Sequence, residues 1–271
     1  MRGAWDMVGI RLGFVVAVGA VALVPDSWMA MAQISGASQT APEIKPQVAP
    51  GVPAVALDPM RTDWPNLKRF HSDDVALPAP TAGEHRVVFM GDSITQGWVH
   101  HGIPADPPDP AKAYVNRGIS GQTTPQMLLR FRQDVIDLKP SVVVIFAGTN
   151  DIAGNTGDMT PKQTEENLES MAELAQVHGI KVVLCSILPA FDFPWKPGRE
   201  PAPKVVAINS WIKDYAASHG HVYVDFYSAM VDARGGLPEK LSKDGVHPNP
   251  AGYAIMTPLV EAGIAQALGG K

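Results

Sequence analysis

The segment Val142-Val-Val-Ile-Phe146 is apolar at every position, and Gly148-Thr-Asn-Asp151 follows it almost at once. A strand with one solvated face alternates apolar and polar side chains, whereas a strand covered on both faces is apolar throughout. This segment therefore predicts a central strand of a parallel sheet that has helices on both sides. The polar residues after it stand where that strand ends.

Four other strand-like runs extend this interpretation along the chain. With the central run, the predicted strands are Arg86–Met90, Tyr114–Asn116, Ser141–Ala147, Lys181–Ile187 and His221–Asp225. Each is followed by a stretch that can form a helix, and parallel strands are joined by right-handed crossovers through such helices. The sequence thus predicts the α/β class, as an open three-layer α/β/α sandwich around a five-stranded parallel sheet.

Two of the intervening helices have clear sequence signals. Thr160-Pro161 supplies an N-cap and a first-turn proline, and Gln163 completes a capping box. The apolar face of this helix comprises Leu168, Met171, Ala172 and Ala175. Thr124-Pro125 opens a similar helix, so we expect a second N-terminus there. Its apolar face comprises Leu128, Phe131, Val135 and Leu138.

The first 32 residues resemble an export signal. Arg2 and Arg11 supply positive charge near the start, and Leu12–Val24 is uncharged and mostly apolar. Ala30-Met31-Ala32 resembles a small-x-small cleavage site. A membrane anchor is the alternative, but this apolar run of 13 residues falls short of the roughly 20 that a spanning helix needs. We therefore expect a signal peptide at 1–32, cleaved near Ala32, and a secreted or periplasmic protein.

Three further regions follow the expected signal. Residues 33–54 are rich in Ala, Ser, Gln and Pro and show no apolar periodicity, which predicts a flexible linker. Residues 55–85 are expected to form an N-terminal extension that packs on the domain. Within it, Trp64, Leu67 and Phe70 are spaced at three and three, which predicts a short helix in Asp58–Leu77. The domain itself then comprises residues 86–271.

Composition limits the classes of partner. The chain has 271 residues, of which 45% are hydrophobic, and this is enough for a full core. Its formal net charge is -5 and it has no basic run, which argues against nucleic acid or an anionic membrane surface as the main partner. Cys185 is the only cysteine, so no intramolecular disulfide can form. Its apolar neighbours indicate a buried small hydrophobic residue rather than a nucleophile.

Two segments more than 150 residues apart hold the residue types of an activated serine. Gly91-Asp-Ser-Ile-Thr95 contains Ser93, and Asp244-Gly-Val-His-Pro248 contains Asp244 and His247. A serine hydroxyl is a poor nucleophile at neutral pH unless a base lies within hydrogen-bond reach and a third group orients that base. Because Asp244 precedes His247 by three residues, a single tight turn can place its carboxylate beside the imidazole.

The candidate residues also share one edge of the predicted sheet. Ser93 follows the first predicted strand, Gly121 the second and Asn150 the third. Asp244 and His247 follow the last strand and precede a final helix. In open α/β sheets, ligands bind beyond the carboxyl ends of the strands. Positions far apart in the sequence are therefore expected to converge on one site.

Four sequence blocks together resemble the SGNH, or GDSL, hydrolases. The blocks are Gly91-Asp-Ser-Ile-Thr95, Asn116-Arg-Gly-Ile-Ser-Gly-Gln-Thr123, Gly148-Thr-Asn-Asp151 and Asp244-Gly-Val-His247, in the family's order. The resemblance runs from about Arg86 to the C-terminus, and it implies a flavodoxin-like fold with esterase or lipase activity. The chain has no Gly-x-Ser-x-Gly motif, which argues against the α/β-hydrolase fold.

The resemblance also implies a role for each matching residue. Ser93 matches the nucleophile, His247 the general base and Asp244 its partner. Ser93, Gly121 and Asn150 match the oxyanion hole, in which fixed donors stabilise the negative charge of a tetrahedral intermediate. The implied chemistry needs no cofactor and no metal.

The leading functional hypothesis is an exported serine esterase that removes short acyl groups, acetyl above all, from a carbohydrate or similar alcohol. Phe191, Phe193 and Trp195 lie after the fourth predicted strand, and aromatic faces can stack on sugar rings or line an acyl pocket. A packing role for this loop is the alternative. Within ester chemistry the alternative is a lysophospholipase or thioesterase, which needs a longer apolar groove. The expected partner is a small-molecule or carbohydrate ester, with no nucleic acid and no stable membrane insertion after signal cleavage.

Two alternatives lie outside ester hydrolysis. A catalytically silent binding module is disfavoured because Ser93 and His247 are both intact. A metal-dependent phosphoesterase would use Asp92, Asp151, Asp244 and His247 as ligands. For Asp92 and Asp151 we instead expect structural roles, in which the carboxylates accept backbone N–H bonds in turns.

Overall fold

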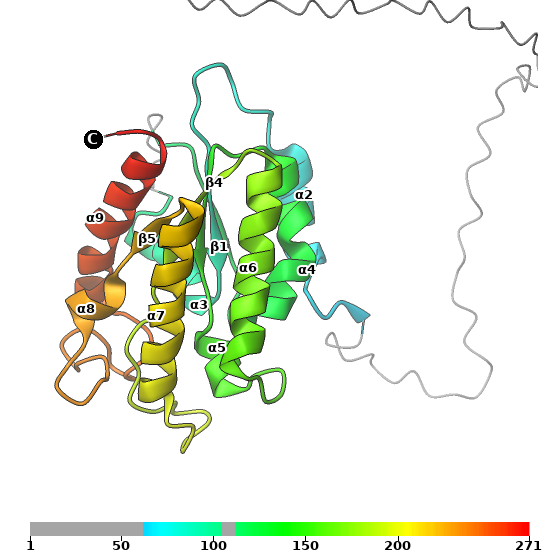
Figure 1. The fold of residues 1–271 in the computed structure, drawn as a ribbon. Coiled ribbons are helices and arrows are strands. Elements are labelled where there is room, and N and C mark those ends of the chain that lie inside the picture. Colours follow the sequence, from blue (N-terminus) through cyan, green and yellow to red (C-terminus); the bar gives the residue numbers. More distant parts are fainter. Residues whose placement is uncertain (1–61, 105–111, 271) are drawn as a thin grey trace, which may run out of the picture. The chain divides into compact units, whose positions relative to one another are not determined.

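The computed structural model describes residues 62–104 and 112–270 (Figure 1). The signal peptide predicted at 1–32 and the linker predicted at 33–54 lie outside these residues, as does the start of the extension at 55–85. Within the described ranges, no helix is both long and apolar enough to cross a bilayer.

The sheet in the described part of the chain has five strands, and all of them are parallel. The strands are β1 (Val87–Gly91), β2 (Tyr114–Gly118), β3 (Val142–Phe146), β4 (Lys181–Cys185) and β5 (Val222–Val224). Their order across the sheet is β2-β1-β3-β4-β5. This is the doubly wound order of flavodoxin, in which the winding reverses between β1 and β3. The predicted fold class is therefore confirmed.

The apolar segment that predicted the sheet lies at its centre. β3 pairs with β1 on one side and β4 on the other, and all five of its residues are buried. Val143 and Ile145 belong to one core cluster, whereas Val142, Val144 and Phe146 belong to a second cluster. Since successive side chains of a strand point to opposite faces, each face of the sheet has its own core.

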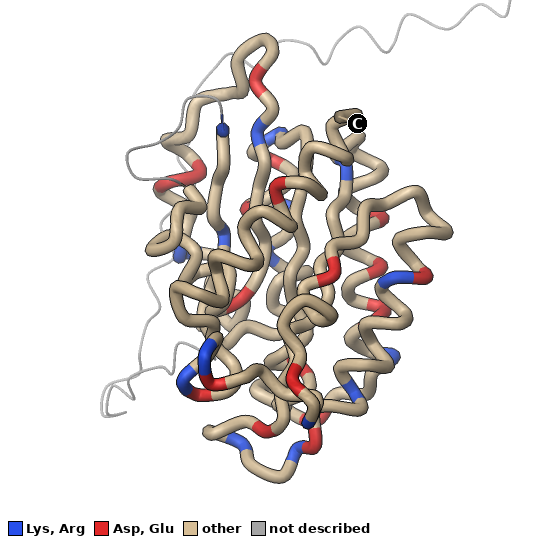
Figure 2. The backbone as a smooth tube through the Cα atoms, turned by 90° about the vertical axis from the view of Figure 1, so that its left-hand side faces the viewer, with Lys and Arg blue, Asp and Glu red and all other residues tan. Residues whose placement is uncertain are grey.

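Helices cover both faces of the sheet (Figure 1). One face packs against α4 (Thr124–Asp134), α6 (Pro161–Val177) and α7 (Pro201–His219). The other packs against α3 (Ser93–Gly97), η2 (Trp98–His101), α8 (Phe226–Met230) and α9 (Pro250–Ala267). Three short helices, α2 (Lys68–Ala76), η3 (Ile136–Leu138) and α5 (Thr149–Ala153), complete the described elements. In the view of Figure 2, basic and acidic residues are interspersed over the helices and loops, in keeping with a sequence that has no basic run.

The two helices with sequence signals form, with one difference. α6 begins with the capping box of Thr160 and Gln163 and buries its predicted apolar face. α4 ends at Asp134, earlier than its apolar spacing predicts, because Val135 leaves the helical region with a φ of -130°. Val135 and Leu138 are nevertheless buried, since η3 turns the chain back onto the core. The prediction that Leu128, Phe131, Val135 and Leu138 share the face of one helix was therefore wrong, although Phe131, Val135 and Leu138 are all buried.

The described part of the extension lies beside α4. Helix α2 begins after Leu67, whose backbone N–H donates to the Asp63 carboxylate at 2.7 Å. Trp64 and Leu67 therefore precede the helix, and only Phe70 of the three predicted apolar positions is buried. The predicted helical face is wrong because Asn66 has a φ of 58°, which interrupts any helix through that spacing.

Amide side chains of the domain bind the backbone of the extension. Gln126 Nε2 donates to the carbonyl oxygen of Trp64 at 2.7 Å, and Gln122 Nε2 donates to that of Pro65 at 2.8 Å. These bonds go to main-chain acceptors, which every residue carries. The side-chain sequence of the extension therefore gives no signal for them.

Strand β2 approaches α3 very closely at Gly118. A Cβ added at this position would lie 2.2 Å from the backbone nitrogen of Gln96 and 2.7 Å from its Cα. Backbone atoms cannot rotate away as a flexible side chain can, so α3 would have to shift. Because Ser93 is the first residue of α3, the close approach also fixes the position of the serine.

We expect Gly118→Ala to lower the free energy of unfolding by about 3 kcal/mol, as overpacking in a dense core does. Gly179→Ala is the matched control, because Gly179 has open space around it and only the cost of its φ of 72° applies, about 1 kcal/mol. Urea denaturation followed by circular dichroism measures both values. An equal loss in the two variants would contradict the steric explanation.

Candidate active site

The residues predicted for the nucleophile, its base, the partner of the base and the oxyanion hole all lie at one edge of the sheet. Ser93 begins α3 directly after β1, and Asn150 lies in α5 after β3. Gly121 lies in the loop between β2 and α4, and Asp244 and His247 lie in the loop before α9. The loops after three adjacent strands thus gather at the carboxyl edge, beside the point where the winding reverses.

Ser93, His247 and Asp244 form a hydrogen-bonded series. Ser93 Oγ lies 2.9 Å from His247 Nε2, and His247 Nδ1 lies 2.7 Å from Asp244 Oδ2. An ionised carboxylate can only accept, so Nδ1 carries the proton and Nε2 of the neutral ring is left to accept the serine proton. The fold therefore joins two segments in which Ser93 and His247 are 154 positions apart.

A tight turn holds the Asp244 carboxylate. Its Oδ1 accepts hydrogen bonds from the backbone N–H groups of Val246 (3.0 Å) and His247 (2.8 Å), and from the Ser242 hydroxyl (2.9 Å). Burial by itself raises the pKa of Asp244, but these bonds and the one from the His247 ring outweigh it and hold that pKa well below its usual range. The carboxylate is thus ionised at any ordinary pH. The side chains of Asp244 and His247 are each 42% exposed.

The backbone at Ser93 is held by Asp92. The Asp92 carboxylate accepts a hydrogen bond from the Ile94 N–H at 2.9 Å and so caps α3. Burial raises the pKa of Asp92 to about 6, although the Ile94 N–H bond opposes the change. The N–H of Ser93 is one of the helix-start donors that have no partner within the helix, and no other acceptor bonds it in the described ranges. It is therefore available to a ligand.

Gly121 has a φ of 78°, in the left-handed region. A residue with a side chain is strained in this conformation. Space is not the reason for glycine, because the nearest atom to an added Cβ is Asn155 Nδ2 at 3.9 Å. The N–H of Gly121 has no hydrogen-bond acceptor within the part of the chain that the structure describes. The turn therefore leaves a second backbone donor available.

Asn150 is almost fully buried, with 4% of its surface exposed. Its Nδ2 donates to the carbonyl oxygen of Gln122 at 3.0 Å and to Asp92 Oδ2 at 3.2 Å. Its Oδ1 accepts from Asn155 Nδ2 at 2.8 Å. A negatively charged ligand oxygen would have to share or replace one of the two Nδ2 bonds, and the longer bond to Asp92 is the weaker one.

Asp151 supports the start of α4. Its carboxylate accepts hydrogen bonds from the Thr124 backbone N–H, at 3.1 Å, and from the Thr124 hydroxyl. Burial raises the pKa of Asp151 to about 6. Asp92 and Asp151 thus both accept backbone N–H bonds at helix starts, as expected from the sequence.

The metal-dependent phosphoesterase would need a group of side chains that can bind a metal ion. In the described ranges, no three His, Cys, Asp or Glu side chains are grouped so that they could hold a metal ion. The carboxylates of Asp92, Asp151 and Asp244 instead accept hydrogen bonds from neighbouring backbone N–H groups.

Two of the three aromatic residues expected to contact substrate reach the surface. Phe191 and Trp195 are 57% and 40% exposed, whereas Phe193 is fully buried. Phe193 belongs to the core, with its ring centroid 5.2 Å from that of Trp195, and so supports Trp195 rather than meeting a substrate. The Trp195 ring lies beside the His247 ring, with centroids 6.0 Å apart. Phe191 instead packs against the Arg234 guanidinium, 5.3 Å from its ring centroid.

Asn155 belongs to the same site but was not predicted from the sequence. Its Nδ2 donates to Asn150 Oδ1 at 2.8 Å and to the Gly121 carbonyl oxygen at 3.2 Å. Its Oδ1 accepts from Trp195 Nε1 at 3.0 Å. The one available signal was its place shortly after the Gly148–Asp151 block, and an asparagine in a loop is common enough to give no further indication.

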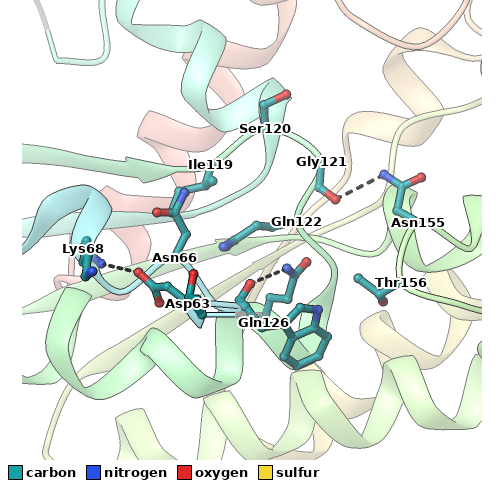
Figure 3. A pocket seen from close by; sticks show the side chains of 12 residues that line it. Asp63, Asn66, Lys68, Ile119, Ser120, Gly121, Gln122, Gln126, Asn155 and Thr156 are labelled. Carbon is teal, nitrogen blue, oxygen red and sulfur yellow. Dashed lines mark hydrogen bonds between the residues drawn. The ribbon is translucent and has the colours of Figure 1, made fainter. Parts of the chain in front are cut away.

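A cavity of about 530 Å³ adjoins Gly121 and Asn155 (Figure 3). Its walls come from the extension, from the loop after β2 and from the loop after α5. Most of the residues that line it are of polar type, among them Asp63, Asn66, Ser120, Gln126 and Thr156, and Trp64 and Ile119 add apolar surface.

The model of the GDSL-like Lipase/Acylhydrolase family matches residues 89–255. This range includes every residue of the hydrogen-bonded series and all three candidate oxyanion donors. The chain belongs to this family. The resemblance inferred from the four sequence blocks is thereby confirmed.

Named relatives agree with this assignment. A crystal structure of a GDSL-like lipase from Bacteroides thetaiotaomicron is 44% identical, with a TM-score of 0.71 over 76% of this chain and 100% of that one. Esterase TesA of Pseudomonas aeruginosa is 32% identical over 64% of this chain and 85% of its own length. An acetylxylan esterase of Xylanibacter ruminicola is 26% identical over 70% of this chain and 45% of its own length. The chain spans about half the length of the first curated relatives that it matches. The names of TesA and of the Xylanibacter ruminicola protein describe those two relatives as esterases.

The raised pKa of Asp151 predicts a pH dependence of stability. The pKa in the folded state, about 6, lies above the ordinary value of 3.8, so the folded state binds this proton more tightly than the unfolded state. The resulting contribution to stability is complete below about pH 4 and is lost as pH rises through about 6. The difference between the two pKa values corresponds to about 3 kcal/mol.

Asp151→Asn removes this titration and keeps an oxygen that can accept from Thr124. Between pH 4 and 7, we expect the free energy of unfolding of the variant to fall less with pH than that of the unmodified protein. Urea denaturation at several pH values measures the difference. Asp137→Asn, at an exposed carboxyl group, is the control. The same pH dependence in all three proteins would rule out Asp151 as the source.

Proposed function

We propose that the protein hydrolyses short-chain carboxylic esters through a serine nucleophile. The observation that carries the proposal is the series of two contacts, 2.9 Å from Ser93 Oγ to His247 Nε2 and 2.7 Å from His247 Nδ1 to Asp244 Oδ2. In this proposal Ser93 is the nucleophile and His247 is the general base. Asp244 orients the imidazole ring and stabilises its protonated form.

The first half of the reaction transfers the acyl group to Ser93. Ser93 Oγ attacks the ester carbonyl carbon, its proton passes to His247 Nε2, and the carbonyl oxygen becomes an oxyanion. When the bond to the alcohol breaks, His247 returns this proton to the leaving oxygen. In the second half, water attacks the acyl-enzyme while His247 takes its proton. When the bond from the acyl carbon to Ser93 Oγ breaks, His247 returns this proton to Oγ, and the acid and free Ser93 are released.

The proposed oxyanion hole combines the N–H groups of Ser93 and Gly121 with Nδ2 of Asn150. The two backbone donors have no competing acceptor within the described ranges, and a side-chain amide is neutral and donates at any working pH. Fixed donors of this kind stabilise the developing charge without having to reorganise during the reaction.

For the substrate we propose a short acyl group, with acetyl preferred, on a carbohydrate or similar alcohol. A leaving oxygen must lie close to His247 Nε2 in order to receive its proton, so the alcohol must pass near Trp195, whose ring is 6.0 Å from that of His247. An exposed aromatic face can stack on a sugar ring. The acetylxylan esterase among the named relatives also supports this class of substrate. Phe191, whose ring is also exposed, is a second proposed contact.

Other functions have less support. A lysophospholipase or thioesterase needs a long apolar groove, whereas the substrate proposed above needs only the exposed Trp195 ring beside His247. A catalytically silent binding module would have no need for Ser93, His247 and Asp244 to form a hydrogen-bonded series.

We further propose that residues 1–32 direct export to the periplasm or the exterior and that the protein has no stable membrane insertion after their removal. The apolar run and the small-x-small motif near Ala32 support this proposal. Residues 33–54 would then connect the new N-terminus to the catalytic domain.

A fluorophosphonate probe tests the proposed nucleophile. We expect the purified protein to be labelled at Ser93, and Ser93→Ala to lose both the label and most turnover of a nitrophenyl acetate while its circular dichroism spectrum is unchanged. Ser170→Ala, at a half-buried serine on α6, is the matched control and should react like the unmodified protein. Full labelling of Ser93→Ala would show that another residue is the nucleophile.

An acyl-length series tests the proposed substrate class. Nitrophenyl esters from two to twelve carbons differ only in the acyl chain, and the proposed preference for acetyl predicts the highest kcat/KM for the shortest chains. A maximum at eight carbons or more would favour the lipase alternative. A screen of acetylated polysaccharides then tests the alcohol.

A further inference from the structure

We propose that Asn155 is a positioning residue, which sets the oxyanion donors and links them to Trp195. The proposal rests on the proposed function, because it assigns Asn155 an effect on the oxyanion hole. Asn155 lies between α5 and α6 and is half-buried. Its side-chain amide contacts Asn150, Gly121 and Trp195 at once.

The contact with Asn150 selects the orientation of that amide. Turning an asparagine amide by half a turn exchanges its oxygen and nitrogen with little change in shape. Asn155 Nδ2 lies 2.8 Å from Asn150 Oδ1, and in the turned orientation two N–H donors would face each other there. The bond thus keeps Nδ2 of Asn150 on the side of Asp92 and Gln122.

The contact with Gly121 restrains a flexible turn. Glycine has more accessible conformations than any other residue, and Gly121 sits in the left-handed region with a φ of 78°. Asn155 Nδ2 donates to the carbonyl oxygen of Gly121 at 3.2 Å. Nδ2 of Asn155 therefore restrains both Gly121 and Asn150, the two residues that complete the proposed oxyanion hole with Ser93.

The contact with Trp195 fixes the orientation of Asn155 itself. An indole N–H can only donate, so the atom of Asn155 that lies 3.0 Å from Trp195 Nε1 must be the oxygen. The nitrogen then has to face Asn150 and Gly121. The Trp195 ring is held in turn by the buried Phe193 and lies beside His247. A continuous series of contacts therefore runs from the aromatic face near His247 to the oxyanion donors.

The direct test is Asn155→Ala, assayed on nitrophenyl acetate. We expect kcat to fall by about 10- to 100-fold with KM changed by less than about threefold, because misplaced oxyanion donors affect the transition state more than ground-state binding. The affinity for a phenylboronic acid, which forms a negatively charged tetrahedral adduct with a serine, should fall in parallel. Unfolding free energies are measured for each variant, so that loss of fold is seen separately.

Asn167→Ala is the matched control. Asn167 is also half-buried, and its alanine variant loses a side-chain hydrogen bond to the Thr124 hydroxyl at 3.0 Å, but Asn167 has no hydrogen bond to Asn150, Gly121 or Trp195. Its kcat should stay within about twofold of the unmodified protein. A loss in Asn167→Ala equal to that in Asn155→Ala would overturn the proposal, because any weakened packing in this region would then suffice.

A double-mutant cycle shows whether Asn155 acts through Asn150. Asn150→Ala alone should lower kcat by about 10²- to 10³-fold. In that background the further cost of Asn155→Ala should shrink to about threefold or less, since the main group that it positions is gone. Equal costs of Asn155→Ala in both backgrounds, or a cost below twofold in the unmodified protein, would overturn the proposal.

Failure of the proposed function has a different signature. If the unmodified protein neither reacts with the fluorophosphonate probe nor hydrolyses the ester, both proposals are wrong. If it is labelled and active but the cycle is additive, the role of Asn155 alone is wrong.

Discussion

Strands β1 and β3 have no face exposed to water, so helices must pack on both sides of them. Each connection between these parallel strands therefore crosses over the sheet, and the chain leaves every strand at the same edge. The reversal of winding next to β1 opens a crevice there. Ser93, Gly121 and Asn150 lie in the segments after β1, β2 and β3, so the fold brings the proposed nucleophile and the proposed oxyanion donors together although they are far apart in the sequence.

A buried cation connects the sheet to this edge. Arg130 on α4 is fully buried, and its guanidinium donates to Asp134 Oδ2 (2.8 Å), to Gln122 Oε1 (2.6 Å) and to the Gly91 carbonyl oxygen (3.1 Å). A buried charge is tolerated when it is paired and its donors are satisfied. Because Gly91 ends β1 and Gln122 follows Gly121, the same guanidinium links the end of β1 to the loop after β2.

Periodicity predicted most of the fold, because a two-sided sheet leaves long apolar runs and a covered helix leaves a regular apolar face. The strands and α6 were found for this reason. The end of α4 at Asp134 and the start of α2 depend on backbone angles at Val135 and Asn66, which apolar spacing does not encode. The residue types of the site were predicted from the four blocks, but the contact of Asn155 with Trp195 depends on two loops meeting in space. The burial of Phe193 likewise depends on how its loop folds back, since Phe191 and Trp195 beside it are exposed.

Asp244 and His247 stand half in solvent, with 42% of each side chain accessible. A base placed in this way needs no channel for water, because bulk solvent already reaches the exposed part of the imidazole. An acyl-enzyme formed on Ser93 would consequently meet water far more often than a second alcohol. Deacylation would then run to the free acid, and net transfer of the acyl group to another acceptor would be confined to media in which water is scarce.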